Sequence, residues 1–391
     1  MSGELNVKIH DKNIGVVSEQ KHEHAFSYHH DVDASDFVSL TMPVRTKSYQ
    51  FQGVHPIFEM SLPEGYLLAV IKKHFAKLTD TEGLGLLKLL APSIKGRLQF
   101  GTENTSGADE LTLSELLHPS SNTLFQELVH RFALSSPVSG VQPKVLANVV
   151  NKATLNIEQY IVKAWGEDYP ELALNEFICM SILKDAGIPV PEFYLSDDQR
   201  LFVMKRFDLL DDGQCLGFED ICVLQGKSSS KKYTGSVEQV LKSVRLFVSE
   251  GHQRTATEQF FKMMVLNNLL QNGDAHLKNF GVLYTSDYDV RLAPAYDVVS
   301  TTYYIQNDIA ALNMLGSKRW RGMKELLDFG VKHCEFSKKR SLELYEHCVE
   351  ACVRARPKIE EHLTNTCNHD QKALLQHFLQ LIDKLKITLL H

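Results

Sequence analysis

The spacing of apolar residues along the chain changes from that of strands to that of helices within the first hundred residues. In residues 1–60, short apolar runs such as Val7–Ile9 are separated by polar turns, which is the pattern of β-strands. Residues 37–40 have the same composition, so we expect a strand there as well. Farther on, the apolar positions recur at helical spacing and predict helices at 66–71 and 84–90.

The pattern changes twice more, which predicts three domains. A polar, turn-rich stretch at residues 102–110 is the best candidate linker, and it ends a first α+β domain at residues 1–105. Residues 125–210 are rich in strands around one helix, and residues 211–391 are mostly helical after residue 236, apart from one hairpin. In the second segment we expect strands at 145–150, 159–164 and 201–204 and a helix at 172–183.

The hairpin brings distant polar residues together. Two apolar runs, 280–284 and 290–295, flank a polar turn centred on Asp287. In a hairpin of this register the numbers of paired residues sum to about 574 to 576. Asn279 then lies opposite Asp297. An amphipathic helix is expected before this region, at residues 259–270. The segment Asn272-Gly273-Asp274 follows that helix.

These polar residues are of the types that phosphoryl transfer requires. One carboxylate must orient or deprotonate the acceptor hydroxyl, while an amide oxygen and a second carboxylate hold Mg²⁺ across the phosphates of ATP. Asp274 and Asn279 stand in the Asp-x-x-x-x-Asn spacing of the protein-kinase catalytic loop, and Asp297 supplies the second carboxylate. A structural alternative stays open for each, because residues 272–274 could form a helix stop and Asp297 a helix cap.

Further parts of an ATP site lie upstream, in the order found in protein kinases. Residues 139–144 form a glycine-containing loop before a strand, where backbone amides could approach phosphates. Lys163 lies near the end of the next strand, and Glu176 on the following helix could hold that lysine. Residues 204–208 end the next strand, where a hinge would contact adenine. Each part alone could be an ordinary turn or a solvated face, but their order favours a phosphotransferase.

Composition and charge narrow the class of protein. The chain has 391 residues, and its 42 Lys and Arg against 48 Asp and Glu leave a net charge of -6, which does not favour a nucleic-acid coat or a membrane-surface protein. Its seven cysteines are few and scattered, as expected for reduced thiols. The first residues lack the pattern of a signal peptide, and no apolar run approaches the roughly 20 residues that cross a bilayer. We therefore expect a cytoplasmic protein without a membrane partner.

At these residues the sequence resembles the HipA family of bacterial serine/threonine kinase toxins. The motifs that carry the resemblance are Ser139-Gly-Val-Gln-Pro-Lys144, Tyr160-Ile-Val-Lys163, Asn175-Glu176, Lys205-Arg-Phe-Asp208, Gly273-Asp-Ala-His-Leu-Lys-Asn279 and Tyr296-Asp297. The resemblance covers nearly the whole chain. It implies an α+β, protein-kinase-like bilobal fold, with a mixed α+β N-lobe and an all-α C-lobe, preceded by an N-terminal α+β subdomain.

The resemblance also implies roles for individual residues, with ATP and Mg²⁺ as cofactors. Asp274 resembles the catalytic base, and Asn279 and Asp297 resemble the Mg²⁺ ligands. The residues that resemble nucleotide contacts are the phosphate loop Ser139, Gly140, Val141, Gln142, Pro143 and Lys144, the phosphate-binding Lys163, the hinge Lys205, Arg206 and Phe207, and His276, Lys278 and Tyr296.

Partners and acceptors follow from the same resemblance. It implies a protein acceptor, notably an aminoacyl-tRNA synthetase, whose modification stalls translation. It further implies a small HipB-like helix-turn-helix antitoxin, through which the complex contacts operator DNA.

The family is regulated by autophosphorylation in the phosphate loop, and here the sequence departs from the family pattern. The family loop commonly begins with serine, whereas this chain has Pro137 at that position. Since proline cannot accept phosphate, we expect Ser139 to be the acceptor, with Ser135 and Ser136 next. A phosphate at Ser139 would repel the phosphates of ATP.

Two other functions are compatible with the same residues. A small-molecule phosphotransferase would have the same fold but a different acceptor. A non-catalytic corepressor bound to an antitoxin would transfer no phosphate. Two basic segments, Lys227–Lys232 and Lys318–Arg321, could flank the cleft and engage an acidic substrate, or could simply be solvated loops.

Overall fold

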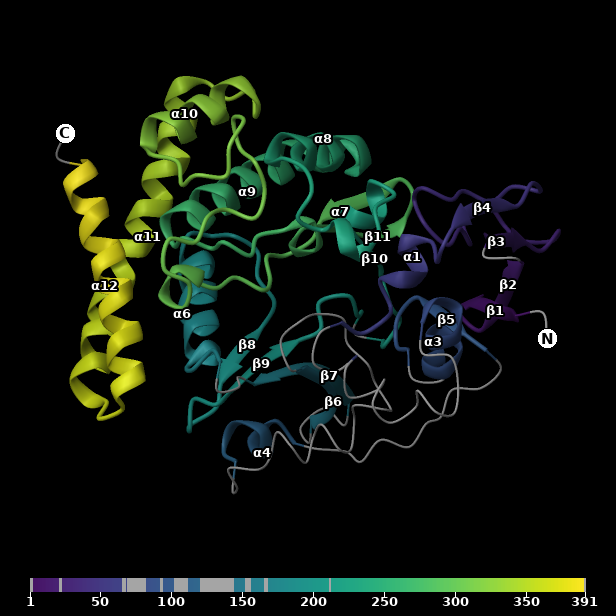
Figure 1. The fold of residues 1–391 in the computed structure, drawn as a ribbon, viewed down its shortest axis with the longest axis horizontal. Coiled ribbons are helices and arrows are strands. Elements are labelled where there is room, and N and C mark those ends of the chain that lie inside the picture. Colours follow the sequence, from purple (N-terminus) through teal and green to yellow (C-terminus); the bar gives the residue numbers. More distant parts are fainter. Residues whose placement is uncertain are drawn as a thin grey trace.

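The computed structural model arranges the chain around three antiparallel sheets (Figure 1). It describes residues 3–20, 23–64, 68, 82–91, 94–101, 112–119, 144–151, 156–164, 168–210 and 212–389. The N-terminal sheet lies at one end of the molecule, and the C-terminal helix α12 (His369–Leu389) lies at the opposite end (Figure 1). Each of the three predicted segments contains one of the sheets.

The N-terminal part is a five-stranded sheet with helices packed on it. Its strands, in the order β4-β3-β2-β1-β5, are β4 (Tyr49–Gln52), β3 (Glu23–Tyr28), β2 (Lys12–Gln20), β1 (Gly3–Ile9) and β5 (Leu98–Phe100). Alternate residues of β1, including Val7 and Ile9, are fully buried, as one face of a sheet requires. Helices α1 (Pro56–Glu59) and α3 (Gly83–Leu90) pack together, and α3 also contacts β1. The predicted strand at 7–9 and the predicted helix at 84–90 are confirmed.

Two expectations in this part have other outcomes. The strand predicted at residues 37–40 is wrong, because Ser39 forms only an isolated bridge to Met42. The segment is apolar for another reason: Phe37 and Val38 are buried in different hydrophobic clusters, so the segment packs between two parts of the molecule without a partner strand. The helix predicted at residues 66–71 lies outside the described residues, apart from Leu68.

The middle part is a four-stranded sheet that supports one long helix. Its order is β6-β7-β9-β8, formed by β6 (Lys144–Asn151), β7 (Asn156–Ala164), β9 (Leu201–Lys205) and β8 (Phe193–Leu195). Helix α6 (Leu172–Asp185) packs on β8 and β9, and the short α4 (Leu113–Leu117) contacts β6 and β9. The three strands and the helix predicted here are confirmed. The register places Lys163 of β7 between Lys144 of β6 and Phe202 of β9.

The C-terminal part is mainly helical. Its helices are α7 (Ile221–Leu224), α8 (Val237–Phe247), α9 (Glu250–Leu269), α10 (Met323–Lys332), α11 (Lys338–Asn365) and α12, and single 3₁₀ turns are η2 (Ser229–Lys231), η3 (Leu277–Asn279) and η4 (Thr301–Tyr303). The predicted hairpin is present as β11 (Gly281–Ser286) and β12 (Asp289–Leu292). Val282 pairs with Leu292 and Tyr284 with Val290, which confirms the predicted register. A third strand, β10 (Gly217–Asp220), pairs with β11, so this lobe contains a small sheet among its helices.

Helix α9 differs from the amphipathic helix that the sequence predicts. It starts earlier, at Glu250, and residues 259–267 are all buried, including Gln259 and Lys262. The reason is position: α9 lies inside the lobe, where it contacts α8, α11 and β12. The buried polar groups are satisfied, because Gln259 donates to the carbonyl of Ala293 and the Lys262 ammonium donates to the carbonyl of Ala186.

The N-terminal part is joined to the helical lobe through a buried carboxyl group. Glu219 of β10 accepts hydrogen bonds from the Ser39 hydroxyl at 2.7 Å, from the Leu40 amide at 2.8 Å and from the Tyr284 hydroxyl at 2.8 Å. This contact fixes the N-terminal part against the sheet of the helical lobe. In that sheet, β10 precedes the candidate catalytic loop in the chain and β11 follows it. Within the described residues, no helix combines the length and the apolar character needed to cross a bilayer.

Candidate active site

A tight turn between α9 and η3 positions Asp274. The Asp274 amide donates to the Asn272 side chain at 3.1 Å, and the Gly273 amide donates to the Thr301 hydroxyl at 2.8 Å. A Cβ atom on Gly273 would lie 2.0 Å from a carboxylate oxygen of Asp308, so any larger residue would have to displace that side chain or the turn. The turn therefore directs Asp274 into the space between the lobes, where it lines a cavity.

Asn279 and Asp297 meet at the end of the hairpin. The Asn279 amide donates to Asp297 Oδ2 at 3.1 Å, and its carbonyl oxygen accepts the backbone N–H of His276 at 3.0 Å. Asp297 has φ of +60°, in the left-handed region that residues other than glycine rarely adopt. A non-glycine residue held in this conformation at a cavity wall is a feature common at functional sites.

Lys163 connects the two lobes. Its ammonium nitrogen lies 2.5 Å from Glu176 Oε1 and 2.8 Å from Asp297 Oδ1. Lys163 is 2% exposed and Glu176 is fully buried, so these charges are paired in a region of low dielectric. Burial alone would lower the pKa of Lys163, but the neighbouring Asp297 and Glu176 outweigh that effect and raise it. Lys163 therefore remains charged.

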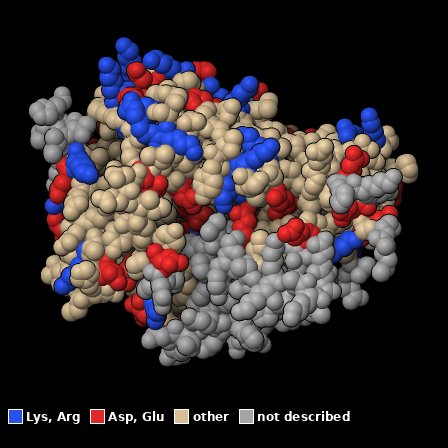
Figure 2. All heavy atoms as spheres, viewed as in Figure 1, with Lys and Arg blue, Asp and Glu red and all other residues tan. Residues whose placement is uncertain are grey.

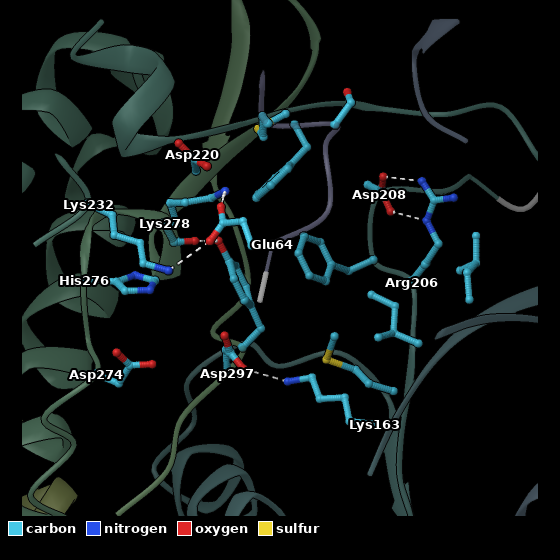
Figure 3. Close-up of a pocket in the computed structure, with 18 of the residues that line it drawn as sticks. Glu64, Lys163, Arg206, Asp208, Asp220, Lys232, Asp274, His276, Lys278 and Asp297 are labelled. Atoms are coloured by element: carbon cyan, nitrogen blue, oxygen red, sulfur yellow. Dashed lines mark hydrogen bonds and ion pairs between the residues drawn. The ribbon is translucent and has the colours of Figure 1, made fainter. Parts of the chain in front are cut away.

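Lys163, Asp274 and Asp297 lie on the wall of a cavity of about 1010 Å³ that all three parts of the chain line (Figure 3), and Asn279 and Glu176 contact them from outside that lining. Of the predicted site residues, those that line it are Lys163, Arg206, Phe207, Asp274, His276, Lys278, Tyr296 and Asp297. Part of the cavity wall is apolar, with Ile161, Met204 and Phe207 among the lining residues, and the Phe207 ring stacks on Tyr296 at 5.3 Å. In the space-filling view, acidic side chains gather along the middle of one face and basic side chains lie above them (Figure 2).

The predicted hinge residues differ in where their side chains point. Arg206 makes a bidentate pair with Asp208, at 2.9 and 2.6 Å, on the cavity wall (Figure 3). The Lys205 ammonium instead pairs with Glu158 at 2.8 Å and is absent from the cavity lining. The side chain of Lys205 therefore does not contact the space where a nucleotide would bind, although its backbone belongs to the strand that forms the wall.

A second group of charges lies opposite Lys163. Glu64, from the N-terminal part, pairs with the ammonium of Lys232 at 2.9 Å and with that of Lys278 (Figure 3). Burial would raise the pKa of Glu64, but Lys278 and Lys232 together hold it at about 2. Lys232 belongs to the basic segment that was predicted as a possible flank of the cleft, and it does line the cavity. No role was predicted for Glu64 from the sequence, so the pairing of these two residues was not predicted.

The surroundings of Asp274 suit a proton acceptor. Burial raises the pKa of Asp274, a hydrogen bond from the Tyr233 hydroxyl at 2.7 Å opposes that rise, and the charge of Asp297 adds to it. Burial also lowers the pKa of His276 to about 4, so that ring is neutral near pH 7. The Tyr296 hydroxyl donates to the backbone carbonyl of Lys278 at 2.8 Å and fixes the end of the catalytic loop.

Part of the predicted phosphate site cannot be placed. Ser139, Gly140, Val141, Gln142 and Pro143 lie outside the described residues, as do Ser135, Ser136 and Pro137. Lys144 is described only as a backbone position at the start of β6, opposite Lys163. The predictions for this loop therefore stay predictions.

The residues present fit ATP and Mg²⁺. Asp297 brings a carboxylate to the cavity wall, and Asn279 contacts that carboxylate from beside the wall through its amide NH₂ group. Carboxylate and amide side chains are the ligand types that Mg²⁺ prefers, and Mg²⁺ needs few protein ligands when it is held with phosphates. The described residues contain no cluster of three or more His, Cys, Asp or Glu that would enclose a metal ion by itself. The lining of the cavity includes apolar side chains that suit a base and ammonium groups that suit phosphates.

Comparison with known proteins identifies the family of the chain. Residues 136–356 match the HipA-like C-terminal domain, and residues 5–101 match the HipA N-terminal domain. "Putative kinase Y4dM" of Sinorhizobium fredii (strain NBRC 101917 / NGR234) is 28% identical over 323 residues, which are 76% of this chain and 75% of that protein. A "Putative kinase" of Haemophilus influenzae is 33% identical over 185 residues, which are 43% of this chain and 53% of that protein.

A solved structure shows the same fold. It is that of HipA in the Shewanella oneidensis MR-1 toxin–antitoxin complex of HipA, HipB and operator DNA. Its TM-score is 0.71 at 20% identity, and the match covers 98% of this chain and 96% of that one. The expected kinase-like bilobal α+β fold is thereby confirmed, and the chain belongs to the HipA family.

Proposed function

We propose that this HipA-family chain is an ATP- and Mg²⁺-dependent protein serine/threonine kinase that acts as a toxin. One observation carries the proposal. Lys163 contacts both Glu176 and Asp297, Asp297 contacts Asn279, and Asp274 lies on the wall of the same cavity. This is the set of lysine, glutamate, asparagine and two carboxylates that positions ATP in protein kinases.

Different residues around the cavity would bind different parts of ATP. The apolar wall with Met204 and Phe207 would hold the adenine ring. Lys163, which Glu176 keeps in place, would bind the phosphates. Asn279 and Asp297 would hold Mg²⁺, which when bound neutralises the negative charge on the phosphates.

Asp274 would handle the proton of the acceptor hydroxyl. Its carboxylate oxygen already accepts a hydroxyl hydrogen bond at 2.7 Å, which lies within the range that proton transfer needs. The raised pKa of Asp274 brings this group closer to the working range of a general base at neutral pH. Asp274 would therefore orient the hydroxyl and accept its proton as the bond to phosphorus forms.

We propose a protein as the acceptor, with an aminoacyl-tRNA synthetase as the first candidate. The N-terminal part contributes Glu64 and Met60 to the wall of the cavity, so the entrance is shaped by a domain that a small-molecule kinase would not require. This proposal rests on the family to which the chain belongs and on that wall. A small-molecule phosphotransferase would instead transfer phosphate to a metabolite and leave the proteins of a lysate unlabelled.

The proposed partner is a HipB-like helix-turn-helix antitoxin in the cytoplasm. The Shewanella oneidensis structure contains HipA together with HipB and operator DNA. The net charge of this chain is -6, so we propose that operator DNA is bound mainly through the antitoxin. We further propose that autophosphorylation of Ser139 regulates activity, because a phosphate there would repel the phosphates of ATP.

The test is transfer of labelled phosphate. The purified chain is incubated with γ-labelled ATP, Mg²⁺ and a cell lysate, and the labelled protein and residue are identified by mass spectrometry. The Asp274→Asn variant should lose transfer by at least about 10²-fold, the scale of a general base. Asp297→Asn should lose transfer and also bind ATP-Mg²⁺ more weakly.

A matched control separates chemistry from folding. Asp287→Asn changes an exposed aspartate in the hairpin turn and should transfer phosphate as the wild type does. Circular dichroism should show that all three variants are folded. Wild-type transfer by Asp274→Asn would refute the assigned base. An antitoxin complex without any nucleotide binding would support the corepressor function instead.

A further inference from the structure

A tyrosine from a neighbouring loop already occupies the acceptor side of the candidate base. Tyr233 follows η2 in the connection between α7 and α8. Its hydroxyl donates to Asp274 Oδ1 at 2.7 Å, and its ring contacts His276 edge to face at 5.0 Å. Tyr233 lines the cavity together with Asp274 and Asp297, and yet it is 43% exposed. It is therefore a rim residue whose hydroxyl reaches inward.

Relative to Asp274, this hydroxyl lies where a phosphoryl acceptor would lie. A general base must lie about 2.6 to 3.2 Å from the oxygen whose proton it takes. In a kinase the acceptor hydroxyl makes that contact with the catalytic aspartate. We infer that Tyr233 is a second site of autophosphorylation, which receives the γ-phosphoryl group of ATP from the active site of its own chain. This inference rests on the proposed kinase function and adds a residue that this function does not require.

The loop is held at its backbone while the ring of Tyr233 stays accessible. The Leu277 amide of the catalytic loop donates to the carbonyl of Lys232 at 3.0 Å, and the Lys232 ammonium pairs with Glu64. The Lys318 ammonium lies 3.5 Å from the carbonyl of Tyr233. These contacts hold the backbone of residues 232 and 233 in place. Its half-exposed ring can still rotate between Asp274 and solvent.

The transfer is a balanced substitution at phosphorus. The Tyr233 oxygen attacks the γ-phosphorus of ATP and forms a new O–P bond. The bond between that phosphorus and the oxygen bridging to the β-phosphate breaks, and ADP leaves with the electron pair. The phenolic proton passes to Asp274, which releases it to water after the ring has moved. The proposed kinase reaction supplies the ATP, so no further reactant is needed.

The charges around Tyr233 make the modification self-limiting. A phosphate adds about -1.5 to -2 charge at neutral pH. It would repel the carboxylate of Asp274 and turn the ring outward. The ammonium of Lys318, which lies 3.5 Å from the carbonyl of Tyr233, offers a cation that can pair with the phosphate there, whereas Lys232 stays paired with Glu64 in the cavity wall. One phosphate per chain is therefore expected at this site.

The test is phosphosite mapping of the full chain after incubation with ATP and Mg²⁺. Wild type should carry phosphotyrosine at position 233. The fraction of chains modified per unit time should stay the same when the protein is diluted, because transfer is intramolecular. Tyr233→Phe and Asp274→Asn should lack this phosphotyrosine. Tyr288→Phe, which changes a tyrosine 82% exposed in the hairpin turn, should retain it.

The possible outcomes separate this inference from the proposed function. Phosphate on Ser139 or on a lysate protein, with Tyr233 unmodified, would overturn the inference and leave the kinase function in place. A rate that falls in proportion to dilution would also overturn it, because the transfer would then occur between chains. No labelled phosphate on any protein would overturn both.

Discussion

Glu219 is a carboxyl group without solvent contact, and its titration should be visible in the stability of the protein. Burial raises its pKa to about 7, although hydrogen bonds from Ser39, Leu40 and Tyr284 work in the opposite direction. In the unfolded chain the same group has its ordinary value of 4.5. A carboxyl with a raised pKa stabilises the folded state fully below about pH 4.5, and this contribution disappears as the pH rises through 7.

The prediction concerns Glu219→Gln. Between pH 5 and pH 8, the free energy of unfolding of the wild type should fall by roughly 3 kcal/mol more than that of the variant, since one pKa unit corresponds to about 1.4 kcal/mol. Urea unfolding at a series of pH values measures the difference, and every other titrating group is common to the two proteins. Glu346→Gln, at an exposed position of α11, is the control. Parallel curves for wild type and Glu219→Gln would contradict the prediction.

At the scale of elements, the catalytic turn depends on the absence of a side chain at residue 273. A Cβ there would meet Asp308 at 2.0 Å and the Thr301 hydroxyl at 2.6 Å. Both of these side chains hold the turn, because Thr301 accepts the Gly273 amide and donates to Asp308. Something must move if a methyl group is added, and Asp274 is the next residue in the chain.

We therefore predict that Gly273→Ala lowers the rate of phosphate transfer by about 10²-fold, the cost of misplacing a catalytic group by about 1 Å. Initial rates with labelled ATP measure the effect, and thermal unfolding checks that the lobe remains folded. Gly251→Ala in the first turn of α9 is the matched control, because a Cβ there would meet no atom within 4 Å beyond the adjacent residues and the backbone of its own helix. A Gly273→Ala enzyme with the wild-type rate would show that the turn can adjust.

Elements were predictable wherever the local pattern determines them. The hairpin register followed from two apolar runs and a polar turn, and it correctly placed Asn279 beside Asp297. The strand predicted at 37–40 failed because burial between two parts of the molecule produces the same apolar composition as a paired strand. Helix α9 was predicted to be amphipathic, whereas tertiary contacts bury even its polar residues Gln259 and Lys262.

At the scale of the whole molecule, the contacts that complete the site join residues far apart in the sequence. Glu64 lies 214 residues before Lys278, and Ser39 lies 180 residues before Glu219. No periodicity or spacing can indicate such pairs, because each partner by itself resembles an ordinary surface charge or turn residue. Motif spacing and the family resemblance both predicted roles for Asp274 and Lys163, but neither indicated a partner for Lys232.

Glu64 provides the last prediction, because it links the N-terminal part to two cations of the cleft. Its carboxylate has 17% exposure and pairs with Lys232 and Lys278, each of which has 10%. Removing one partner of a buried ion pair leaves the other charge uncompensated, at a cost near 3 kcal/mol or somewhat less for this partly exposed group. Glu64→Gln should therefore lower the free energy of unfolding at pH 7 by about 2 to 3 kcal/mol.

The pH dependence and a matched control make this prediction specific to the charge of Glu64. Since the pKa of Glu64 is depressed to about 2, its contribution is present above its unfolded value of 4.5 and is lost as the pH falls through 2. The effect of Glu64→Gln should thus be full at pH 7 and should shrink below pH 4. Glu59→Gln is the control. Among the hydrogen bonds described, Glu59 accepts only the amide of Ser229, which lies in the same loop as Lys232. The side-chain oxygen of glutamine can accept that hydrogen bond as well. Equal losses in the two variants would show that loop packing, not the ion pairs, joins the N-terminal part to the cleft.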